Sequence, residues 1–361
     1  MIVGHGGNVH EAARTLGCRA SAIIDMSSNV NPLGPMPELV DTLTDNLAEM
    51  TVLPDAAARL PVQYFAAHHR LDPGRVLAGN GTTQFIYTLP RALEVERALI
   101  LGPTYADYAD ACTLWGVPVE TLLADPRRGF APDLDRIERQ ADGFDTIFIC
   151  NPNNPTGRLI PGARLGDLCR NHPRTRFVVD ESYLPFVIDG ETHSLIDSHL
   201  PNVIVLHSLS KIFRIPGLRI GFLIAAPKAV HALQPYMLPW SVNSLAQAAV
   251  AYLMTHADEV ARFVALSRRH VQRERDRVIR EFADHAGIRF FNSDTLFILG
   301  HLRGPRTAAD IQACLLREKI LIRNCENFNG LSDRYIRISL KTPDVNVRLT
   351  QLLNRCLTEG V

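Results

Sequence analysis

The chain has 361 residues, of which 46% are hydrophobic and 21% are charged. This length favours two domains, and the composition is that of a soluble globular protein without extended disorder. The 38 basic and 38 acidic residues cancel, which argues against nucleic acid or an anionic membrane as the main partner.

The cysteine pattern and the N-terminus bear on where the protein works. Seven cysteines are scattered without a CxxC pair, which predicts reduced thiols and neither a disulfide framework nor a zinc site. The first residues lack the layout of a signal peptide, and no stretch reaches the roughly 20 apolar residues of a membrane span. The 13 histidines show no coherent metal spacing. We therefore expect a cytoplasmic protein that binds no metal and no membrane.

The N-terminal segment, residues 1–25, is predicted to be an arm that precedes the first domain. Asn8 is placed to cap a short helix, with Glu11 at the third helical position completing a capping box and Gly17 ending the helix. This arrangement leaves residues 5–7 in a flexible stretch before the helix.

Residues 26–238 are predicted to form a large α/β domain. From Val76 to about Leu223, short apolar runs alternate with helical stretches, which indicates a mostly parallel sheet covered by helices on both faces. The runs are RALIL (97–101), VPVETLL (117–123), TIFIC (146–150), RFVVD (176–180), VIVLH (203–207) and RIGFLIA (219–225). Ligands of such sheets lie beyond the carboxyl ends of the strands, and the unusual residues of this chain fall there.

Residues 239–361 are predicted to form a smaller C-terminal domain. Its first element is a long polar helix, roughly Asp258 to His285, with apolar positions at helical spacing. The strand RFFNSDTLFIL, the helix AADIQACLLREK, the strands ILIRNC and RYIRISL and a closing helix follow. This order is typical of an α+β domain.

A lysine stands where a buried strand ends. The segment SLSKIFRIPGLR (208–219) sets Ser208, Ser210, Lys211 and Arg219 around a sharp bend. Lysine is normally a surface residue, so Lys211 either reaches water or has a chemical task. This short segment leaves both interpretations open.

Asp180 ends an apolar strand at the predicted ligand edge, where an unpaired carboxylate is costly. A protonated pyridine nitrogen would be a suitable cationic partner, and the pair would keep an aromatic ring able to accept electrons. The alternative is an aspartate that caps the next helix.

The run AGNGTTQF (78–85) joins a strand to a helical stretch. Gly81, Thr82 and Thr83 offer backbone and hydroxyl donors at the helix N-terminus, a pattern typical of a phosphate site. Such turns also occur without any ligand. Arg219 and the two serines of SLSK would add a bidentate cation and two hydroxyls to the same phosphate.

Two further motifs follow strands. NPNNPTG (151–157) is a rigid loop in which Asn154 can donate a hydrogen bond to a fixed ligand oxygen. Tyr105, in GPTYADY, is placed either to stack on a planar ring or to be an ordinary core tyrosine.

The strings AGNGT, PTY, NPNNPTG, VVDESY, SLSK and PGLRIGF occur in this order and resemble the fold type I enzymes of the class I/II aminotransferase group, which use pyridoxal phosphate (PLP). The resemblance spans nearly the whole chain. It implies that Lys211 forms a Schiff base with PLP, that Asp180 pairs with the pyridine nitrogen and that Tyr105 stacks on the ring. It assigns the ring hydroxyl to Asn154 and Tyr183, the cofactor phosphate to Thr82, Ser208, Ser210 and Arg219, and the substrate α-carboxylate to Arg337.

The two ends of the chain resemble the L-threonine-O-3-phosphate decarboxylases of cobalamin biosynthesis more than the histidinol-phosphate aminotransferases. The strings that carry this preference are HGGN (5–8), SSNVNPLGP (27–35) and ILIRNCENFNGL (320–331). The resemblance places Arg323 beside Arg337, with His5 and Gly6 of the arm over the substrate phosphate. The alternative for Arg323 is a surface arginine on an edge strand.

The implied reaction is decarboxylation of L-threonine O-3-phosphate to (R)-1-amino-2-propanol O-2-phosphate, in which the Cα–carboxylate bond is aligned with the ring π system. The alternatives are a histidinol-phosphate or related aminotransferase, in which Lys211 removes the Cα proton, and a PLP-fold protein without turnover. A homodimer is also implied. Leu53 stands where the family has a tyrosine that reaches the neighbouring subunit's cofactor phosphate, and SDTLF (293–297) lacks an asparagine of related aminotransferases.

Overall fold

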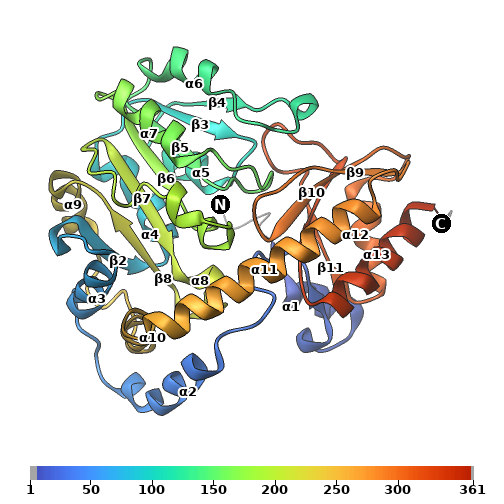
Figure 1. The fold of residues 1–361 in the computed structure, drawn as a ribbon, viewed down its shortest axis with the longest axis horizontal. Coiled ribbons are helices and arrows are strands. Elements are labelled where there is room, and N and C mark those ends of the chain that lie inside the picture. Colours follow the sequence, from blue (N-terminus) through green and yellow to red (C-terminus); the bar gives the residue numbers. More distant parts are fainter. Residues whose placement is uncertain (1–5, 359–361) are drawn as a thin grey trace.

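The structure, a computed structural model, describes residues 6–358 of the chain. Its centre is a seven-stranded sheet with the order β2-β8-β7-β6-β5-β3-β4 (Figure 1). Strand β8 runs antiparallel to both neighbours, and the other adjacent strands run parallel. The strands are β2 (Val76–Asn80), β3 (Ala98–Gly102), β4 (Val119–Leu123), β5 (Thr146–Cys150), β6 (Arg176–Asp180), β7 (Val203–Ser208) and β8 (Ile220–Ile224). The predicted α/β fold with a mostly parallel sheet is confirmed.

Helices and strands of the large domain share one core. Strand β5 is buried at every position, with Ile147 and Phe148 fully enclosed, as expected for a parallel strand covered on both faces. The helices are α2 (Pro37–Asp45), α3 (Arg59–His69), α4 (Thr82–Ala92), α5 (Asp107–Leu114), α6 (Leu134–Ala141), α7 (Gly162–Asn171), α8 (Leu209–Ile212), α9 (Pro227–Leu233) and α10 (Ser244–Thr255). None of the helices within residues 6–358 has the length and apolar character of a membrane span.

The C-terminal part has its own sheet and core. Helix α11 (Ala257–Glu281) runs from the large sheet to this second layer (Figure 1). The antiparallel sheet has the order β12-β13-β10-β9, and its apolar face packs with α12 and α13 around residues such as Ile298, Ile311 and Leu349. The elements are β9 (Ile288–Phe290), β10 (Phe297–Leu302), α12 (Ala308–Arg317), β11 (Ile320–Leu321), β12 (Arg323–Asn324), β13 (Tyr335–Ser339) and α13 (Pro343–Thr358).

The prediction of one continuous strand for RFFNSDTLFIL is wrong in the middle of this segment, because the chain leaves the sheet between β9 and β10. The intervening loop docks on the NPNNPTG turn of the large domain. The Asp294 N–H donates to the Gly157 carbonyl over 2.8 Å, and the Leu159 N–H donates to the Asp294 carboxylate over 3.0 Å. These long-range bonds replace the ladder bonds that a continuous strand would have made.

Helix α10 follows residue 238, the predicted domain boundary, and so falls in the range that was assigned to the small domain. It packs against α2 and α3, and its Ala246, Ala249 and Val250 are buried in the large core. The core of the large domain therefore includes α10, and α11 then leads away from this core. The boundary at residue 238 stays a prediction.

The N-terminal helix α1 (Val9–Leu16) forms as expected but without the predicted capping box. The Asn8 side chain makes no capping hydrogen bond, whereas Gly17 ends the helix with a left-handed φ of 62°. The following strand β1 (Ile24–Asp25) pairs in parallel with β11 of the small domain. This pairing fixes the end of the arm to the C-terminal part.

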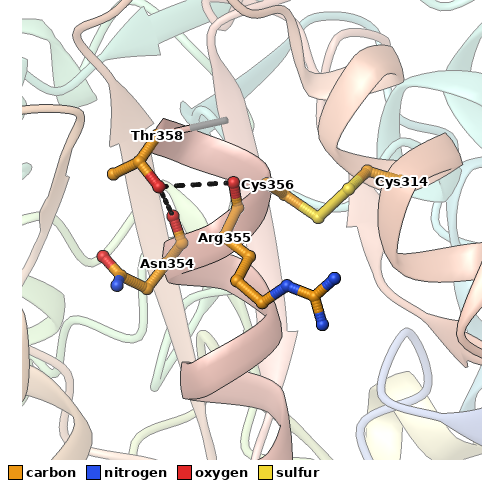
Figure 2. The surroundings of a disulfide bond; sticks show 5 residues. All are labelled: Cys314, Asn354, Arg355, Cys356 and Thr358. Carbon is orange, nitrogen blue, oxygen red and sulfur yellow. Dashed lines mark hydrogen bonds between the residues drawn. A yellow bond between two sulfur atoms is a disulfide. The ribbon is translucent and has the colours of Figure 1, made fainter. Parts of the chain in front are cut away.

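One pair of cysteines contradicts the expectation of reduced thiols. Cys314 in α12 and Cys356 in α13 form a disulfide, and their Cα atoms lie 6.1 Å apart (Figure 2). The two residues are 42 positions apart in the sequence, so spacing alone gave no indication of the bond. Packing of the two helices brings them together.

Candidate active site

Seven of the predicted site residues line one cavity at the carboxyl ends of the central strands, whereas Asp180 and the predicted phosphate-site residues are not part of its lining. The cavity has a volume of about 230 Å³. Large-domain residues on its wall are Tyr105, Asn154, Tyr183 and Lys211, and small-domain residues are Arg323 and Arg337. Gly6 of the N-terminal arm also lines it, and His5 lies outside the described residues. The site therefore forms where the two domains and the arm meet.

Lys211 lies in α8, the short helix that follows β7 directly, and it is half-buried on the cavity wall. Burial, reinforced by the Arg219 and Arg337 guanidinium groups, lowers the pKa of the Lys211 amine, and Asp180 opposes the shift only in part. A lowered pKa favours the neutral amine, which is the nucleophilic form. The structure therefore favours a chemical task over a solvated surface lysine.

Asp180 ends β6 and is only 5% exposed. Its carboxylate accepts a hydrogen bond from the Tyr108 hydroxyl over 2.8 Å and from the Ser182 N–H over 2.9 Å. The next helical turn begins with Tyr183 at its N-cap position, so Asp180 does not serve as that cap. These two hydrogen bonds fix the position of the carboxylate, which suits it to a cationic partner.

Tyr108 is a residue that the sequence reasoning missed. It is buried in α5, three positions after Tyr105, which precedes that helix, and the two rings meet edge to face with centroids 5.8 Å apart. Burial and the Asp180 carboxylate raise the pKa of Tyr108, so it stays a hydrogen-bond donor. The i, i+3 spacing of two tyrosines in GPTYADY was the available signal. Burial and Asp107 likewise raise the pKa of Tyr105.

Asn29 was also missed, although it lies in the quoted string SSNVNPLGP. Its amide donates to the Tyr183 hydroxyl over 3.3 Å, and burial raises the pKa of Tyr183 to about 12. The buried Asn29 side-chain oxygen has no hydrogen-bond partner within residues 6–358. Because an unsatisfied buried acceptor is costly, this oxygen points to a missing ligand donor in the cavity.

At the predicted phosphate site, the backbone at Gly81 and Gly221 lies close to neighbouring groups. Gly81 has a φ of 73° and precedes the first turn of α4, which begins with Thr82 and Thr83. A Cβ atom at Gly81 would lie 2.5 Å from the Arg219 guanidinium, and one at Gly221 would lie 2.6 Å from the Thr82 nitrogen. Only glycine leaves room for the helix N–H groups and the guanidinium to face one anion. The arrangement fits a phosphate group.

The two serines of SLSK are both buried beside this turn. Ser210 donates its hydroxyl hydrogen bond to the Ile220 carbonyl over 3.1 Å, which holds the bend between β7 and β8. Arg219 adopts a left-handed φ of 55°. This backbone conformation is one of several left-handed positions in the structure, and here it follows directly on the short turn Pro216–Leu218.

Arg337 and Arg323 stand directly opposite each other in the register of β13 and β12. Arg337 is 4% exposed and donates to the Asn154 side-chain oxygen and to the Ser27 carbonyl. Arg323 donates to the Asn327 side-chain oxygen over 2.6 Å. Burial and the neighbouring Arg337 lower the pKa of Arg323 to about 10. Two like charges on facing positions are unfavourable without anions between them.

The arm closes this end of the cavity. A Cβ atom at Gly6 would lie 2.7 Å from the Ser27 carbonyl oxygen and 3.6 Å from the Arg323 side chain. The Gly7 N–H donates to the Ser27 hydroxyl over 2.8 Å. The backbone of the arm therefore lies close both to Arg323 and to Ser27, which follows β1.

Comparisons with known proteins agree with this geometry. Residues 21–352 match the model of the aminotransferase class I and II family. Threonine-phosphate decarboxylase of Salmonella typhimurium is 33% identical, covering 98% of this chain and 96% of that protein. Histidinol-phosphate aminotransferase of Symbiobacterium thermophilum is 31% identical, covering 98% of this chain and 96% of that protein. The crystal structure of L-threonine-O-3-phosphate decarboxylase from Porphyromonas gingivalis is similar with a TM-score of 0.83 and 30% identity, covering 92% of this chain and 99% of that chain.

The chain therefore belongs to the aminotransferase class I and II family. It has the fold type I architecture and is an enzyme that depends on PLP. The expectations of fold, cofactor and enzymatic nature are confirmed.

Proposed function

We propose that this enzyme decarboxylates L-threonine O-3-phosphate to (R)-1-amino-2-propanol O-2-phosphate, which enters the cobalamin nucleotide loop. The observation that carries the proposal is the facing pair Arg323 and Arg337 on the wall of the Lys211 cavity. A substrate with a carboxylate at one end and a phosphate at the other supplies one anion to each guanidinium. Such a ligand would relieve the repulsion between them.

The cofactor side of the site follows from the large domain. We assign Lys211 to the covalent bond with the cofactor aldehyde and Asp180 to the proton on the pyridine nitrogen. Tyr105 would lie against the ring, and Asn154 and Tyr183 would contact the ring oxygen. The phosphate would lie in the cradle of Gly81, Thr82, Thr83, Ser208, Ser210 and Arg219. PLP, when bound, supplies an electron sink for the pair left on Cα.

The substrate side determines which bond breaks. Arg337 with Asn154 would bind the α-carboxylate, and Arg323 with His5 and Gly6 would bind the side-chain phosphate. Fixing both ends limits rotation about Cα and directs the carboxylate out of the ring plane. The bond between Cα and the carboxylate then breaks, carbon dioxide leaves, and a proton is added to Cα.

The second candidate is a histidinol-phosphate or related aminotransferase, which the relative of that name from Symbiobacterium favours. In that reaction Lys211 would take the Cα proton as a base, and its lowered pKa suits this role as well. One experiment separates the two. Purified holoenzyme is incubated with L-threonine O-3-phosphate, and carbon dioxide release with retention of the aldehyde cofactor supports the decarboxylase. Conversion of the cofactor to its amine form supports the aminotransferase instead.

We further infer a homodimer from an exposed apolar surface near the cofactor phosphate cradle. Leu53 is 72% exposed, and the nearby Trp240 is 51% exposed. The Trp240 N–H donates to the Ala56 carbonyl over 3.0 Å, and the Asn80 side chain donates to the Ser241 carbonyl over 2.9 Å. These bonds join the surface to the end of β2. The exposed apolar residues of the two segments are Leu47, Met50, Val52, Leu53, Leu238 and Trp240.

Exposed apolar residues on two hydrogen-bonded segments are a feature that protein–protein interfaces often have. Leu53 has no hydroxyl group, so it would contribute apolar contact across a dimer and not a hydrogen bond to the partner's cofactor. Measurement of the mass in solution tests the proposal, and a fully active monomer would contradict it.

A further inference from the structure

The turn between β12 and β13 holds the Arg323 side chain through an asparagine. The Glu326 N–H donates to the Asn324 side-chain oxygen over 2.9 Å, and the Phe328 N–H donates to the Cys325 carbonyl over 3.1 Å. This turn places Asn327 and Phe328 beside Arg323 on the cavity wall.

Arg323 contacts both of these residues. Its Nη2 donates to the Asn327 Oδ1 over 2.6 Å, and its guanidinium carbon lies 5.2 Å from the centre of the Phe328 ring. Because a guanidinium group can only donate, the amide oxygen and not the amide nitrogen must face it. The orientation of the Asn327 amide is therefore fixed by chemistry.

The acceptors named here for the two facing arginines are neutral oxygen atoms. Arg337 donates to an amide oxygen at Asn154 and to the carbonyl of Ser27. Elsewhere in the molecule, the partly buried Arg268 pairs instead with the Glu191 carboxylate. A neutral acceptor fixes the direction of a guanidinium group without cancelling its charge. A carboxylate in the same place would instead add a negative charge to the cavity wall where an anion of the ligand is expected.

We propose that Asn327 is a positioning residue that fixes Arg323 for the substrate phosphate. Its neutral amide sets the preference for a phosphorylated over an unphosphorylated amino acid. The identity of the anion as a substrate phosphate rests on the proposed function. A carboxylate at position 327 would keep the hydrogen bond to Arg323 but would compete with that phosphate for its charge. Asn327→Asp therefore separates the electrostatic role from simple support of the turn.

The chain offers a matched control in the same turn. Asn329 is exposed, and its amide donates to the Thr121 hydroxyl over 3.2 Å. Asn329→Asp adds the same charge two positions along the chain. The Thr121 hydroxyl can donate to the new carboxylate, so the turn keeps its contact with the large domain.

The first measurement uses inorganic phosphate as a probe of the holoenzyme, in which the cofactor occupies its own phosphate cradle. Protection against thermal unfolding at rising phosphate concentration gives an apparent Kd. We expect Asn327→Asp to raise this Kd about tenfold or more, because a charge-assisted contact is replaced by repulsion. Asn327→Ala, which loses the hydrogen bond but adds no charge, should raise it by a smaller factor. Asn329→Asp should match the unmodified enzyme.

The second measurement compares L-threonine O-3-phosphate with L-threonine. For Asn327→Asp, KM for the phosphorylated compound should rise by more than kcat falls, and binding of L-threonine should change by less than about twofold. Equal losses for both compounds, or equal effects of the two aspartate variants, would overturn the proposal. If Asn327→Asp does not fold, the same comparison is made with Asn327→Ala, and an unchanged phosphate Kd would again overturn it.

The two measurements also separate this inference from the proposed function. Weakened phosphate binding in Asn327→Asp, together with no carbon dioxide from L-threonine O-3-phosphate in the unmodified enzyme, would support the role of Asn327 and refute the decarboxylase.

Discussion

The two walls of the active-site cavity are built in different ways. On the large-domain side, Asp180 is the last residue of β6, and Gly81 and Lys211 follow the ends of β2 and β7. On the small-domain wall, Arg323 and Arg337 meet through the register of two short antiparallel strands. The first wall is assembled by neighbouring strand ends, and the second depends on a loop, a turn and the arm. We therefore expect changes on the first wall to affect chemistry and changes on the second to affect substrate choice.

The largest effect should come from Lys211→Ala on the large-domain wall. Activity should fall by about a thousandfold or more, because the variant lacks the amine needed for covalent attachment and proton transfer. The visible absorbance of the bound cofactor should shift or disappear while the melting temperature changes little. Product release and absorbance spectra check this, and a variant that keeps both would sink the assignment of Lys211.

Arg337→Ala should have the next largest effect and should act through binding. Loss of the buried guanidinium group leaves Asn154 and the substrate carboxylate without their partner, and we expect KM to rise about a hundredfold. Steady-state kinetics measure this directly. Arg337→Lys is the charge-matched control and should recover only part of the loss, because an ammonium group cannot bond to two partners in the planar geometry of arginine. Full recovery by lysine would contradict a role for that geometry.

The disulfide Cys314–Cys356 lies behind the small-domain wall and should affect stability before activity. Removing a cross-link between residues 42 positions apart enlarges the unfolded ensemble, so Cys314→Ser should lower the free energy of unfolding by about 2 kcal/mol. Denaturant unfolding with and without a reducing agent checks this. The reducing agent should destabilise the unmodified enzyme and leave Cys314→Ser unchanged; equal responses would argue against the bond.

The smallest effect on activity concerns Glu181, the buried neighbour of Asp180, whose ionisation changes stability. Burial raises the pKa of Glu181 to about 7, while its side chain accepts hydrogen bonds from Ser194 and Leu195. The unfolded chain ionises near pH 4.5, so this group lowers stability progressively from that pH to about pH 7. Below pH 4.5 both states are protonated and the penalty vanishes.

Glu181→Gln removes this ionisation. Relative to the unmodified enzyme, the variant should therefore gain about 3 kcal/mol in unfolding free energy between pH 4.5 and pH 8. Unfolding curves at the two pH values give the difference directly. A relative stability that is independent of pH would show that Glu181 is not protonated preferentially in the folded state.

The sequence by itself determined the elements and the chemistry of the large-domain wall. Apolar runs such as TIFIC and RFVVD coincide with β5 and β6, because strands buried on both faces need continuous apolar residues. The rule that ligands lie beyond the ends of parallel strands then grouped Lys211, Asp180 and Asn154. Gly81 was identifiable because a tight phosphate turn requires a residue without a side chain.

Only the tertiary structure decided the features that depend on contacts between distant segments. These include the facing register of Arg323 and Arg337, the hydrogen bond from Asn29 to Tyr183, the break between β9 and β10 and the disulfide of Cys314 and Cys356. Local periodicity reports which face of an element is buried but not which partner covers it. Those partners are chosen by the packing of the whole chain, so the contacts that hold Arg323 and Arg337 in place became visible only in three dimensions.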